Sequence, residues 1–349
     1  MASIKDVAKK AGVSISTVSN VINGTKHVSD KLKQRILDAI KELNYEVDPV
    51  ARSLKSKRTM TIGVIITSIN RIFFPQVLRG IQDEASRNGY NITFYNTDDS
   101  FEKEKHYVQM LENNWVDGII VDSVADSENK DYFISLANLG SSKKHIPVIS
   151  LERKIDGFGI GSVAVNNHLG GRIATQHLIE QGCKKIAHIA GPSGSCMAQD
   201  RLSGYREELL KNGLDIDNTR IYEGDFSPPG GYQAMKHMLI SGVEVDGVFA
   251  ANDQMAIGAI KAIKEHGYRI PEDIKVVGFD NSFVASIVEP SLTTVNVPKY
   301  KLGAMAVHML LKRISGDSVD ADFIELPINL IVRQSTDLHG DKSWDLYGW

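Results

Sequence analysis

One group of residues near the N-terminus has the types and the spacing needed to contact nucleic acid. Val18, Val21 and Ile22 recur at the spacing of a buried helical stripe. The side chains that this stripe leaves pointing outward are Ile15, Ser16, Ser19 and Asn20. On a helix that enters the major groove of DNA, such a face lies against the base edges. The segment therefore predicts DNA recognition.

Two helices and a turn must position this face. The segment before it has apolar residues at helical spacing, which predict a first short helix. These residues are Ile4, Val7, Ala8 and Ala11. Gly12 then supplies a position where a positive φ costs little, as a tight turn requires. Two helices joined in this way make a helix-turn-helix, although the pattern alone also fits any small helical hairpin.

A third helix is predicted from Ser29, a suitable N-cap residue, with an inner apolar stripe. The stripe consists of Leu32, Ile36, Ile40 and Leu43. Residues 1–58 carry 12 Lys and Arg against 6 Asp and Glu, whereas the rest of the chain carries 28 against 37. A basic head on an acidic body is expected if only the head touches a polyphosphate. Candidates for phosphate contacts, each of which also fits a solvated basic face, are Lys26, Lys31, Lys33 and Arg35.

A second group of residues has the chemistry of a sugar-binding site. Aromatic rings stack on the apolar C–H faces of sugars, and carboxylates and guanidinium groups bind paired hydroxyls. Residues of these kinds follow predicted strands: Phe73, Phe74, Asp98, Asp99, Glu152, Arg153, Arg201, Phe226, Asn252 and Asp280. Taken singly, the first two also fit a hydrophobic core, and the first three carboxylates also fit solvated loop charges.

The elements that position this second group begin at Thr61, where short β-branched runs start to alternate with amphipathic helices. The predicted strands cover 61–67, 91–96, 117–122, 146–151, 161–167, 185–191, 246–253 and 274–281. Strands that alternate with helices form parallel sheets. Because the series restarts near residue 161, we expect an α/β core of two doubly wound parallel-sheet subdomains. Ligands of such sheets bind beyond the C-terminal strand ends, which places the second group in a cleft between the subdomains.

Other classes of protein find little support in the sequence. The histidines are scattered, and the glycine-rich segment 157–161 follows a charged loop rather than a strand, so we expect no enzyme, no metal and no cofactor. Cys183 and Cys196 lack metal-ligand spacing and fit two reduced thiols. The apolar runs are too short to span a bilayer. Because the N-terminus lacks the pattern of a signal peptide, we expect a cytoplasmic protein.

Residues 45–58 predict a linker with a basic end. Pro49 suits the first turn of a short helix, and Ala51 and Leu54 would share one face of it. A helix this short is marginal in water, so one hypothesis is that it forms only on DNA. Leu54 would then act as an apolar wedge between base steps in the minor groove. A plain interdomain linker is the alternative.

With these residues in view, the sequence resembles the LacI-type family of bacterial transcriptional regulators over about residues 3–337. The motifs that carry the resemblance are IKDVAKKAGVSISTVSNVING, VARSL, NTDD, VDGII, KIAHIAGP, DRLSGY, GDFSPPGGYQAM, FAANDQMAIGA, IPEDIKVVGFDN, PSLTTV and VRQST. The resemblance implies a helix-turn-helix, a hinge helix and a core with the periplasmic-binding-protein fold. It also implies a homodimer on a pseudopalindromic double-stranded DNA operator, with a small effector that sets DNA affinity.

The resemblance also implies roles for individual residues. The DNA contacts are expected from Ser14, Ile15, Ser16, Thr17, Ser19, Asn20 and Asn23, and from Ala51 and Leu54 in the hinge. The effector contacts are expected from Phe73, Phe74, Glu152, Arg201, Phe226, Asn252 and Asp280, to which the cleft chemistry adds Asp98.

Three departures from the family pattern matter. Asn20 replaces the usual arginine, and asparagine prefers adenine to guanine. The hinge begins YEVDP, which places Glu46 and Asp48 near phosphates that repel them, so DNA affinity is expected to be modest or more dependent on the effector. The tail 341–349 lacks the leucine heptads of tetrameric members, so we expect a dimer.

The sequence therefore predicts a DNA-binding head at 1–46, a hinge or linker at 47–58, and an effector-binding and dimerisation core at 59–340. Within the core, one subdomain is expected at about 59–164 and 295–324, and the other at about 165–294 and 325–340. The predicted function is a transcriptional repressor controlled by a carbohydrate. The alternatives are a purine or other non-sugar effector, or a sugar-binding protein without a DNA role.

Overall fold

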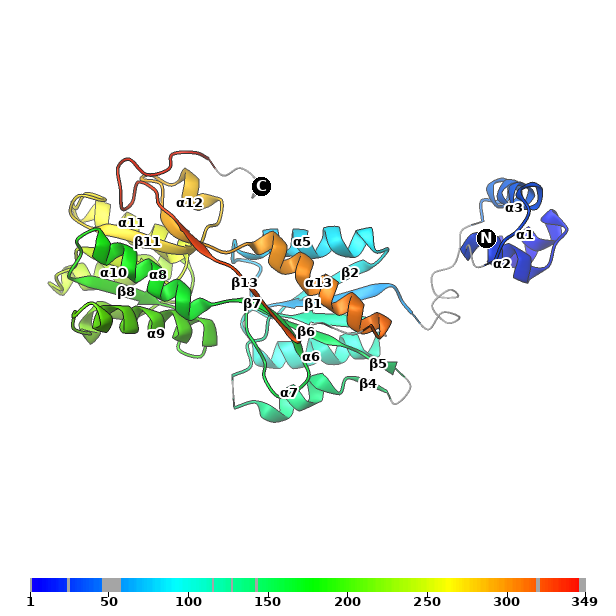
Figure 1. Cartoon of the computed structure of the whole chain (residues 1–349), viewed down its shortest axis with the longest axis horizontal. Coiled ribbons are helices and arrows are strands. Elements are labelled where there is room, and N and C mark those ends of the chain that lie inside the picture. The colour runs from blue at the N-terminus through cyan, green and yellow to red at the C-terminus, as the bar shows by residue number, and fades with distance from the viewer. Residues whose placement is uncertain are drawn as a thin grey trace. The chain divides into compact units, whose positions relative to one another are not determined.

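The computed structural model of the chain describes residues 2–23, 26–45, 58–114, 116–126, 128–141, 144–317 and 321–344. They fall into two units, a head, Met1–Thr59, and a core, Met60–Trp349 (Figure 1). Ala51 and Leu54 lie outside the described residues, as does the side chain of Asn23. The DNA contacts of these three residues stay predictions.

The head consists of three helices, α1 (Ile4–Ala11), α2 (Ile15–Asn23) and α3 (Asp30–Glu42). Ser3 and Asp6 form a capping box at the start of α1, and Gly12 adopts a φ of 59° at its end. The buried side chains come from all three helices and are Val7, Ala8, Ala11, Val18, Ile36 and Ala39. The helix-turn-helix predicted from the apolar stripes is therefore confirmed.

Arg35, which is exposed, also has a structural contact within the head. Its Nε and Nη2 donate hydrogen bonds to the carbonyl oxygen of Ala11 at 2.8 and 2.6 Å. The last carbonyl groups of a helix have no partner within that helix, so Arg35 caps α1 and ties α3 to the turn. Its role as a phosphate contact stays a prediction, since Arg35 is also exposed.

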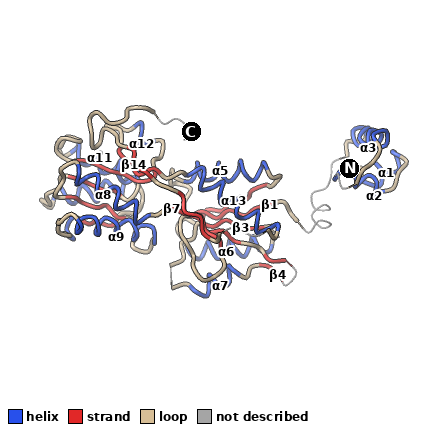
Figure 2. The backbone as a smooth tube through the Cα atoms, viewed as in Figure 1, coloured by secondary structure: helices blue, strands red, loops and turns tan. Residues whose placement is uncertain are grey.

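The core contains two six-stranded sheets that lie in separate subdomains (Figure 2). In spatial order, the first sheet consists of β13 (Phe323–Leu326), β7 (Gly161–Val165), β6 (Val148–Leu151), β3 (Gly118–Val121), β1 (Thr61–Ile66) and β2 (Asn91–Asn96). The second consists of β14 (Asn329–Ile331), β12 (Thr293–Asn296), β11 (Lys275–Asp280), β10 (Gly247–Ala250), β8 (Ile186–Ala190) and β9 (Ile221–Glu223). All neighbouring strands pair in parallel except β12 with β14.

Helices cover both faces of each sheet. The first subdomain contains α5 (Phe74–Arg87), α6 (Phe101–Asn113), α7 (Lys130–Ala137) and α13 (Lys299–Ser315). The second contains α8 (Asn167–Glu180), α9 (Cys196–Lys211), α10 (Pro228–Ile240), α11 (Asp253–Glu265), α12 (Val284–Ile287) and the 3-10 turn Asn218–Arg220. On β1, Ile62, Val64 and Ile66 join a different core cluster from Ile65, as the alternation of side chains along a strand requires. None of the helices in the described part of the chain is long and apolar enough to cross a lipid bilayer.

The chain passes between the subdomains three times, between β7 and α8, between β12 and α13, and between β13 and β14. The predicted doubly wound architecture is confirmed. The short elements that were not predicted are α7, β9, α12, the 3-10 turn Asn218–Arg220 and a hairpin of β4 (Gly140–Ser141) and β5 (Lys144–His145).

Pairs of glycines let neighbouring helices approach closely. A Cβ atom added at Gly80 of α5 would lie 2.1 Å from the carbonyl oxygen of Tyr300 on α13, and one added at Gly303 of α13 would lie 2.1 Å from that of Val77. Gly171 and Gly204 have the same reciprocal relation between α8 and α9. Close backbone contact therefore fixes the spacing within these helix pairs.

The substitution Gly80→Ala is expected to destabilise the core. Overpacking typically costs about 1–3 kcal/mol, although alanine is favoured over glycine in a helix by roughly 1 kcal/mol. The measurement is urea-induced unfolding followed by circular dichroism. The control is Gly194→Ala, where no heavy atom lies within 4 Å of the added Cβ. Equal unfolding midpoints for the two variants would show that α5 and α13 separate without cost.

Candidate functional site

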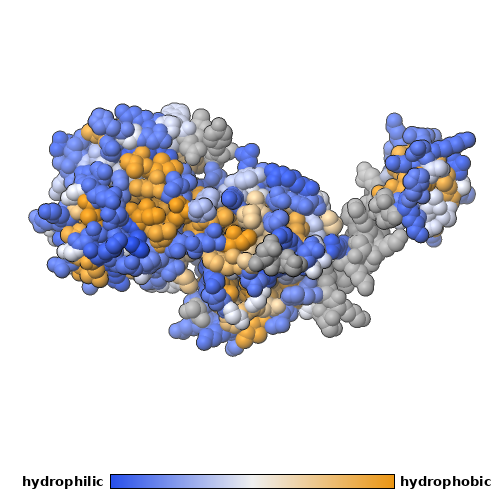
Figure 3. Space-filling model, in the orientation of Figure 1, coloured by the Kyte–Doolittle hydropathy of each residue, from blue (hydrophilic) through white to orange (hydrophobic). Residues whose placement is uncertain are grey.

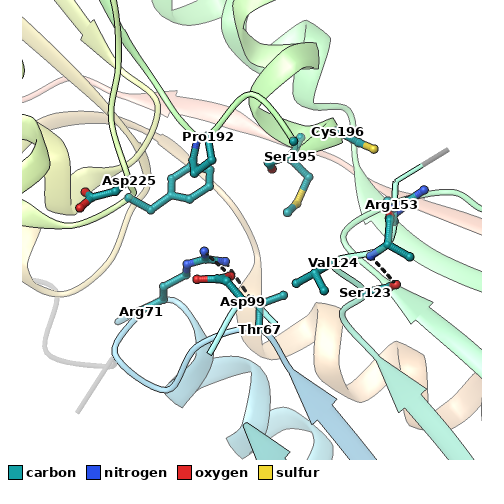
Figure 4. A pocket seen from close by; sticks show the side chains of 14 residues that line it. Thr67, Arg71, Asp99, Ser123, Val124, Arg153, Pro192, Ser195, Cys196 and Asp225 are labelled. Carbon is teal, nitrogen blue, oxygen red and sulfur yellow. Dashed lines mark hydrogen bonds and ion pairs between the residues drawn. The ribbon is translucent and has the colours of Figure 1, made fainter. Parts of the chain in front are cut away.

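Two adjoining cavities lie between the subdomains, at the carboxyl ends of the strands. The outer cavity has a volume of about 320 Å³ and the inner cavity one of about 30 Å³. Arg71, Met197 and Phe226 line both cavities. Figure 4 shows the outer cavity, where side chains from the two subdomains surround an open centre.

The structure brings together most of the predicted effector residues around the inner cavity. They are Phe73, Phe74, Glu152, Arg201, Phe226, Asn252 and Asp280. Glu152 directly follows β6, Asn252 lies between β10 and α11, and Asp280 ends β11. This placement agrees with the rule that ligands bind beyond the carboxyl ends of parallel strands.

Asp98 is the exception among the predicted effector residues. It lines neither cavity, and its carboxylate accepts hydrogen bonds from Lys103 Nζ and Asn96 Nδ2, both at 2.5 Å. The adjacent Asp99 lines the outer cavity instead and binds Arg71 at 2.7 Å. Asp98 and Asp99 both adopt positive φ in the turn after β2, and their side chains have different partners. The prediction is corrected to Asp99.

Arg201 is a buried cation at the floor of the inner cavity. Its Nε donates to Asn167 Oδ1 at 2.9 Å and its Nη1 to the carbonyl oxygen of Ala251 at 2.6 Å. Its guanidinium lies over the ring of Phe279 at 3.7 Å and 3.9 Å from Asp280 Oδ1. Burial lowers the pKa of Arg201, and the nearby carboxylates oppose that shift. Arg201 therefore holds a fixed positive charge at the bottom of the site.

Glu152 and Asp280 are buried carboxyl groups that interact with this cation, and a further buried carboxyl group, Asp122, interacts with Glu152. Burial raises the pKa of Glu152 to about 8, that of Asp280 to about 7 and that of Asp122 to about 6. Their mutual repulsion adds to the shift in Glu152, whereas Arg201 opposes it. Among the described residues, Glu152 Oε1 has no hydrogen-bond partner. The inner cavity therefore offers an unused carboxyl oxygen to a polar ligand group.

Asn252 has a positioning role. Its Oδ1 caps α11 by accepting from the backbone N–H of Met255 at 2.9 Å, and its Nδ2 donates to the carbonyl oxygen of Phe226 at 3.0 Å. Phe226 has a φ of 64°, an unfavourable conformation for a bulky residue. Asn252 therefore helps to hold the Phe226 ring at the boundary between the two cavities.

Glu104 supports the wall of the outer cavity from beneath, although it touches neither cavity. This buried carboxylate of α6 accepts from Ser123 Oγ at 2.6 Å, from the N–H of Val124 at 2.8 Å and from Tyr132 Oη at 2.8 Å. Arg153 donates to the carbonyl oxygen of Ala125 in the same loop. The wall is therefore fixed by buried polar contacts.

The head presents its predicted recognition face on α2. Ile15 is 44% exposed, Ser14 and Ser16 are exposed, and Ser19 and Asn20 are partly exposed. The hydroxyl of Ser14 bonds those of Ser16 at 2.7 Å and Thr17 at 2.8 Å. Since these hydroxyls also order the start of the helix, they are held in place before any contact with DNA.

Comparisons with known proteins agree with both parts of the chain. The family described as bacterial regulatory proteins, lacI family, matches residues 3–48, and a periplasmic binding protein-like domain matches residues 175–336. The ribose operon repressor of Halalkalibacterium halodurans is 39% identical, covering 96% of this chain and 97% of that protein. The HTH-type transcriptional repressor PurR of Mannheimia succiniciproducens is 36% identical, covering 96% and 98%. The chain belongs to the LacI family.

Solved structures of LacI-family proteins extend the match to the whole fold. The lac repressor dimer bound to operator and the anti-inducer ONPF has a TM-score of 0.86 at 32% identity, covering 96% of this chain and 99% of that chain. The CelR–cellobiose complex has a TM-score of 0.72 at 32% identity, covering 96% and 100%. The matches thus cover both the head and the core, as in a DNA-binding regulator with a ligand-binding domain.

Arg71 is a site residue that the sequence analysis missed. Its guanidinium lies 4.8 Å from the centre of the Phe226 ring and also donates to Thr67 Oγ1 at 2.8 Å. Arg71 belongs to a loop between β1 and α5, and Phe226 belongs to the other subdomain, so the pair bridges the cleft. The signal that was available is its position two residues before Phe73, in the same loop after a strand.

Gln254 fastens the loop of Arg71 from the opposite subdomain. Its Oε1 accepts from the backbone N–H of Ile72 at 3.0 Å, and its Nε2 donates to the carbonyl oxygen of Asn70 at 3.3 Å. We call this pair of hydrogen bonds the clasp. It joins the subdomains beside the inner cavity, which Gln254 also lines.

The raised pKa values predict a specific pH dependence of stability. Between the ordinary pKa of a glutamate, 4.5, and its folded-state pKa of about 8, Glu152 keeps a proton that the unfolded chain releases. The free energy of unfolding therefore falls as pH rises through this window, by up to roughly 1.4 kcal/mol per pH unit for one retained proton. Glu152→Gln should flatten the decline, as measured by denaturant unfolding at pH 5, 6, 7 and 8.

The matched control for this experiment is Glu102→Gln, whose carboxylate is on the surface of α6. It should keep the wild-type slope. An unchanged slope in Glu152→Gln would show that Glu152 does not hold the proton.

From the clasp we predict that the loop 70–72 becomes more mobile when its two hydrogen bonds to Gln254 are lost. Gln254→Leu keeps the size of the side chain but removes both hydrogen bonds to the loop 70–72. We expect hydrogen–deuterium exchange in a peptide covering 68–73 to speed up severalfold, since the N–H of Ile72 loses its acceptor. Gln82→Leu is the control, because the side-chain hydrogen bond of Gln82 lies within α5, to Ser86. Exchange as slow as in the wild type would mean that the clasp does not hold the loop.

Proposed function

We propose that the chain is a dimeric transcriptional repressor whose operator affinity is set by a small polyhydroxylated effector, most simply a sugar. The observation that carries the proposal is the inner cavity, where Glu152 of one subdomain faces Arg201 and Asp280 of the other beside the Phe226 ring. Carboxyl and guanidinium groups bind paired hydroxyls, and an aromatic ring covers the apolar face of a sugar. A helix-turn-helix head supplies the DNA contact.

The division of labour along the chain follows from this proposal. Residues 1–46 bind DNA, 47–58 link the head to the core, and 59–340 bind the effector and the second subunit, with the core divided at about 165, 295 and 325. Figure 3 shows apolar side chains gathered over the second subdomain on one face of the core, with smaller apolar areas over the first subdomain. Such areas mark sites where proteins associate. Because an operator is genomic DNA, the protein acts in the cytoplasm.

The mechanism couples the cleft to the head. A ligand that touches both subdomains favours the arrangement in which they are closed, because only then does it make all its contacts. In a dimer, a change in the angle between subdomains shifts the two linkers relative to each other, and DNA affinity changes with it. The effector thus acts through its differential affinity for two states of the core.

The names of related proteins bear on the class of effector. One relative is a ribose operon repressor, and two solved relatives hold cellobiose and D-xylulofuranose. Other relatives are named PurR. We favour a sugar because several carboxyl groups converge on the inner cavity and match a ligand with many hydroxyl donors. A purine remains the alternative that the experiment below separates.

The test measures DNA binding and effector response together. An operator is selected from genomic fragments with the purified protein, and its affinity is followed by fluorescence anisotropy with neutral sugars and purine bases. We expect a sugar to change operator affinity at least fivefold, in the range of ordinary allosteric coupling. Phe226→Ala should bind the operator normally but lose this response.

Two variants of the head provide a further measurement for this test. Asn20→Ala should weaken operator binding about tenfold or more, since a bidentate base contact is worth about 1–3 kcal/mol, whereas Gln34→Ala on α3 should not. A response to purines alone would refute the sugar assignment. Failure to select any DNA fragment would refute the regulator and favour a sugar-binding protein without a DNA role.

A further inference from the structure

The turn that carries Asp280 has an unusual backbone conformation. Asp280 has a φ of 105° and Asn281 a φ of 51°, both in the region that favours glycine. Two consecutive residues of this kind persist only where the surrounding structure holds them in place. The contacts that hold this turn therefore also determine where the Asp280 carboxyl group lies.

Side chains of the second subdomain hold one side of the turn. Asp253 Oδ2 accepts hydrogen bonds from the N–H and the hydroxyl group of Ser282 at 2.7 and 2.8 Å. Arg333 Nη2 donates to Asn281 Oδ1 at 2.9 Å, and Thr294 Oγ1 accepts from the N–H of Asn281 at 3.2 Å. These contacts keep the turn in register with its own subdomain.

Lys299 holds the turn from the other subdomain. It is the buried first residue of α13. Its Nζ donates to the carbonyl oxygens of Asp280 at 2.5 Å, Asn281 at 2.8 Å and Val297 at 3.3 Å. Because an ammonium group has three donors, these carbonyl oxygens match it in number. Since Val297 lies in the passage between β12 and α13, one side chain joins that passage to the turn.

The start of α13 is fixed to the first subdomain. A Cβ atom added at Gly80 of α5 would lie 2.1 Å from the carbonyl oxygen of Tyr300, the residue after Lys299. The hydroxyl group of Tyr300 also donates to Asp83 at 3.1 Å and accepts from Arg87 at 3.2 Å, both on α5. Lys299 therefore moves with the first subdomain, whereas the carbonyl oxygens of the turn belong to the second.

We propose that Lys299 is a positioning residue that couples the Asp280 turn to the angle between the subdomains. This inference rests on the proposed function, in which an effector contacts Asp280. When α13 moves with the first subdomain, Lys299 draws the turn with it, so the place of the Asp280 carboxyl group differs between the two states of the core. The effector then binds the two states with different affinity, which is the condition for shifting the balance between them.

The charge of Lys299 strengthens this coupling. Hydrogen bonds from an ammonium group are stronger than those between neutral groups. Burial raises the pKa of Asp280 to about 7, and the charges of Arg201 and Lys299 oppose this rise. A neutral side chain of similar length would therefore fill the space of Lys299 but release the turn.

The test separates effector binding from effector response. Lys299→Met keeps the length of the side chain and removes its three donors. Operator affinity is measured by fluorescence anisotropy with and without D-ribose, D-xylose, D-glucose, D-galactose and purine bases, and the binding of the responding compound by calorimetry. We expect each Kd, measured alone, to stay within about threefold of wild type, whereas the change in operator affinity caused by the compound falls from about fivefold or more to less than about twofold.

The matched control is Lys301→Met, because Lys301 lies in the same turn of α13 and is exposed. It should respond like the wild type. A loss of stability alone lowers the fraction of folded protein and weakens both binding reactions. It does not change the factor by which one ligand alters affinity for the other. This factor therefore distinguishes positioning from a merely structural role.

A further variant and a measurement on the wild type cover the possibility that Lys299→Met does not fold. Lys299→Gln retains two amide donors and should respond more weakly than wild type. In the wild type, the responding compound should alter hydrogen–deuterium exchange in peptides covering 278–284 and 297–303 together, because Lys299 joins these segments. A change confined to 278–284 would overturn the proposal.

The outcomes separate this inference from the proposed function. A wild-type response in Lys299→Met would overturn the coupling role and leave an effector-controlled regulator intact. Loss of effector binding itself in a folded Lys299→Met variant would also overturn it, since Lys299 would then serve binding. If no compound changed the operator affinity of the wild type, the proposed function would fail and this inference with it.

Discussion

The burial of the Arg201 charge is the constraint on which the effector site depends. A guanidinium group inside a protein is tolerated only with partners, because removing a charge from water is costly. The partners of Arg201 come from three places in the second subdomain, namely Asn167 at the start of α8, the carbonyl of Ala251 after β10, and Phe279 and Asp280 at the end of β11. These loops and strand ends are therefore fixed by one side chain.

The approach of two helices makes this arrangement possible. A Cβ atom at Gly171 of α8 would lie 2.2 Å from the carbonyl oxygen of Arg201 itself. Only glycine lets α9 come near enough to α8 for Arg201 to reach Asn167. The same close packing recurs at Gly204, where a Cβ would lie 2.1 Å from the carbonyl oxygen of His168. Backbone packing and site electrostatics are thus one feature of the second subdomain.

The sequence predicted those parts of the structure that depend on local pattern. Helical spacing in the head and the alternation of strands and helices in the core were sufficient for the fold. The general position of the site followed too, because residues after parallel strands meet at one edge. The direction in which a single side chain points could not be predicted from the sequence pattern. Asp99 lines the outer cavity and Asp98 does not, although both lie in the same turn. Nothing in their order along the chain predicts which of the two faces the cavity.

Residues with long-range partners were the hardest to predict. In the sequence, Arg35 fits a basic residue on the surface. In the fold, it donates a hydrogen bond to the carbonyl oxygen of Ala11, 24 residues away. Asn252 reads as a ligand contact, yet both ends of its amide are used to hold α11 and Phe226. Arg71 reads as an ordinary loop charge until Phe226 lies beneath it. For each of these residues the sequence shows the chemical type of the side chain, but the packing of the fold determines which partner that side chain contacts.

The energies at the cleft are of the size that an allosteric switch needs. The clasp contributes two hydrogen bonds, each worth about 0.5–1.5 kcal/mol net, and couplings between effector and DNA are typically about 1–3 kcal/mol. The closed arrangement of the core is thus held by an energy that a ligand can match with a few contacts of its own. Above the raised pKa values of Glu152 in the first subdomain and Asp280 in the second, the two carboxylates would repel each other and work against closure. A ligand hydroxyl that satisfies Glu152 and a ring that binds both walls would each favour closure. Because these contributions come from opposite sides of the cleft, only a ligand that spans it changes the balance between the two states.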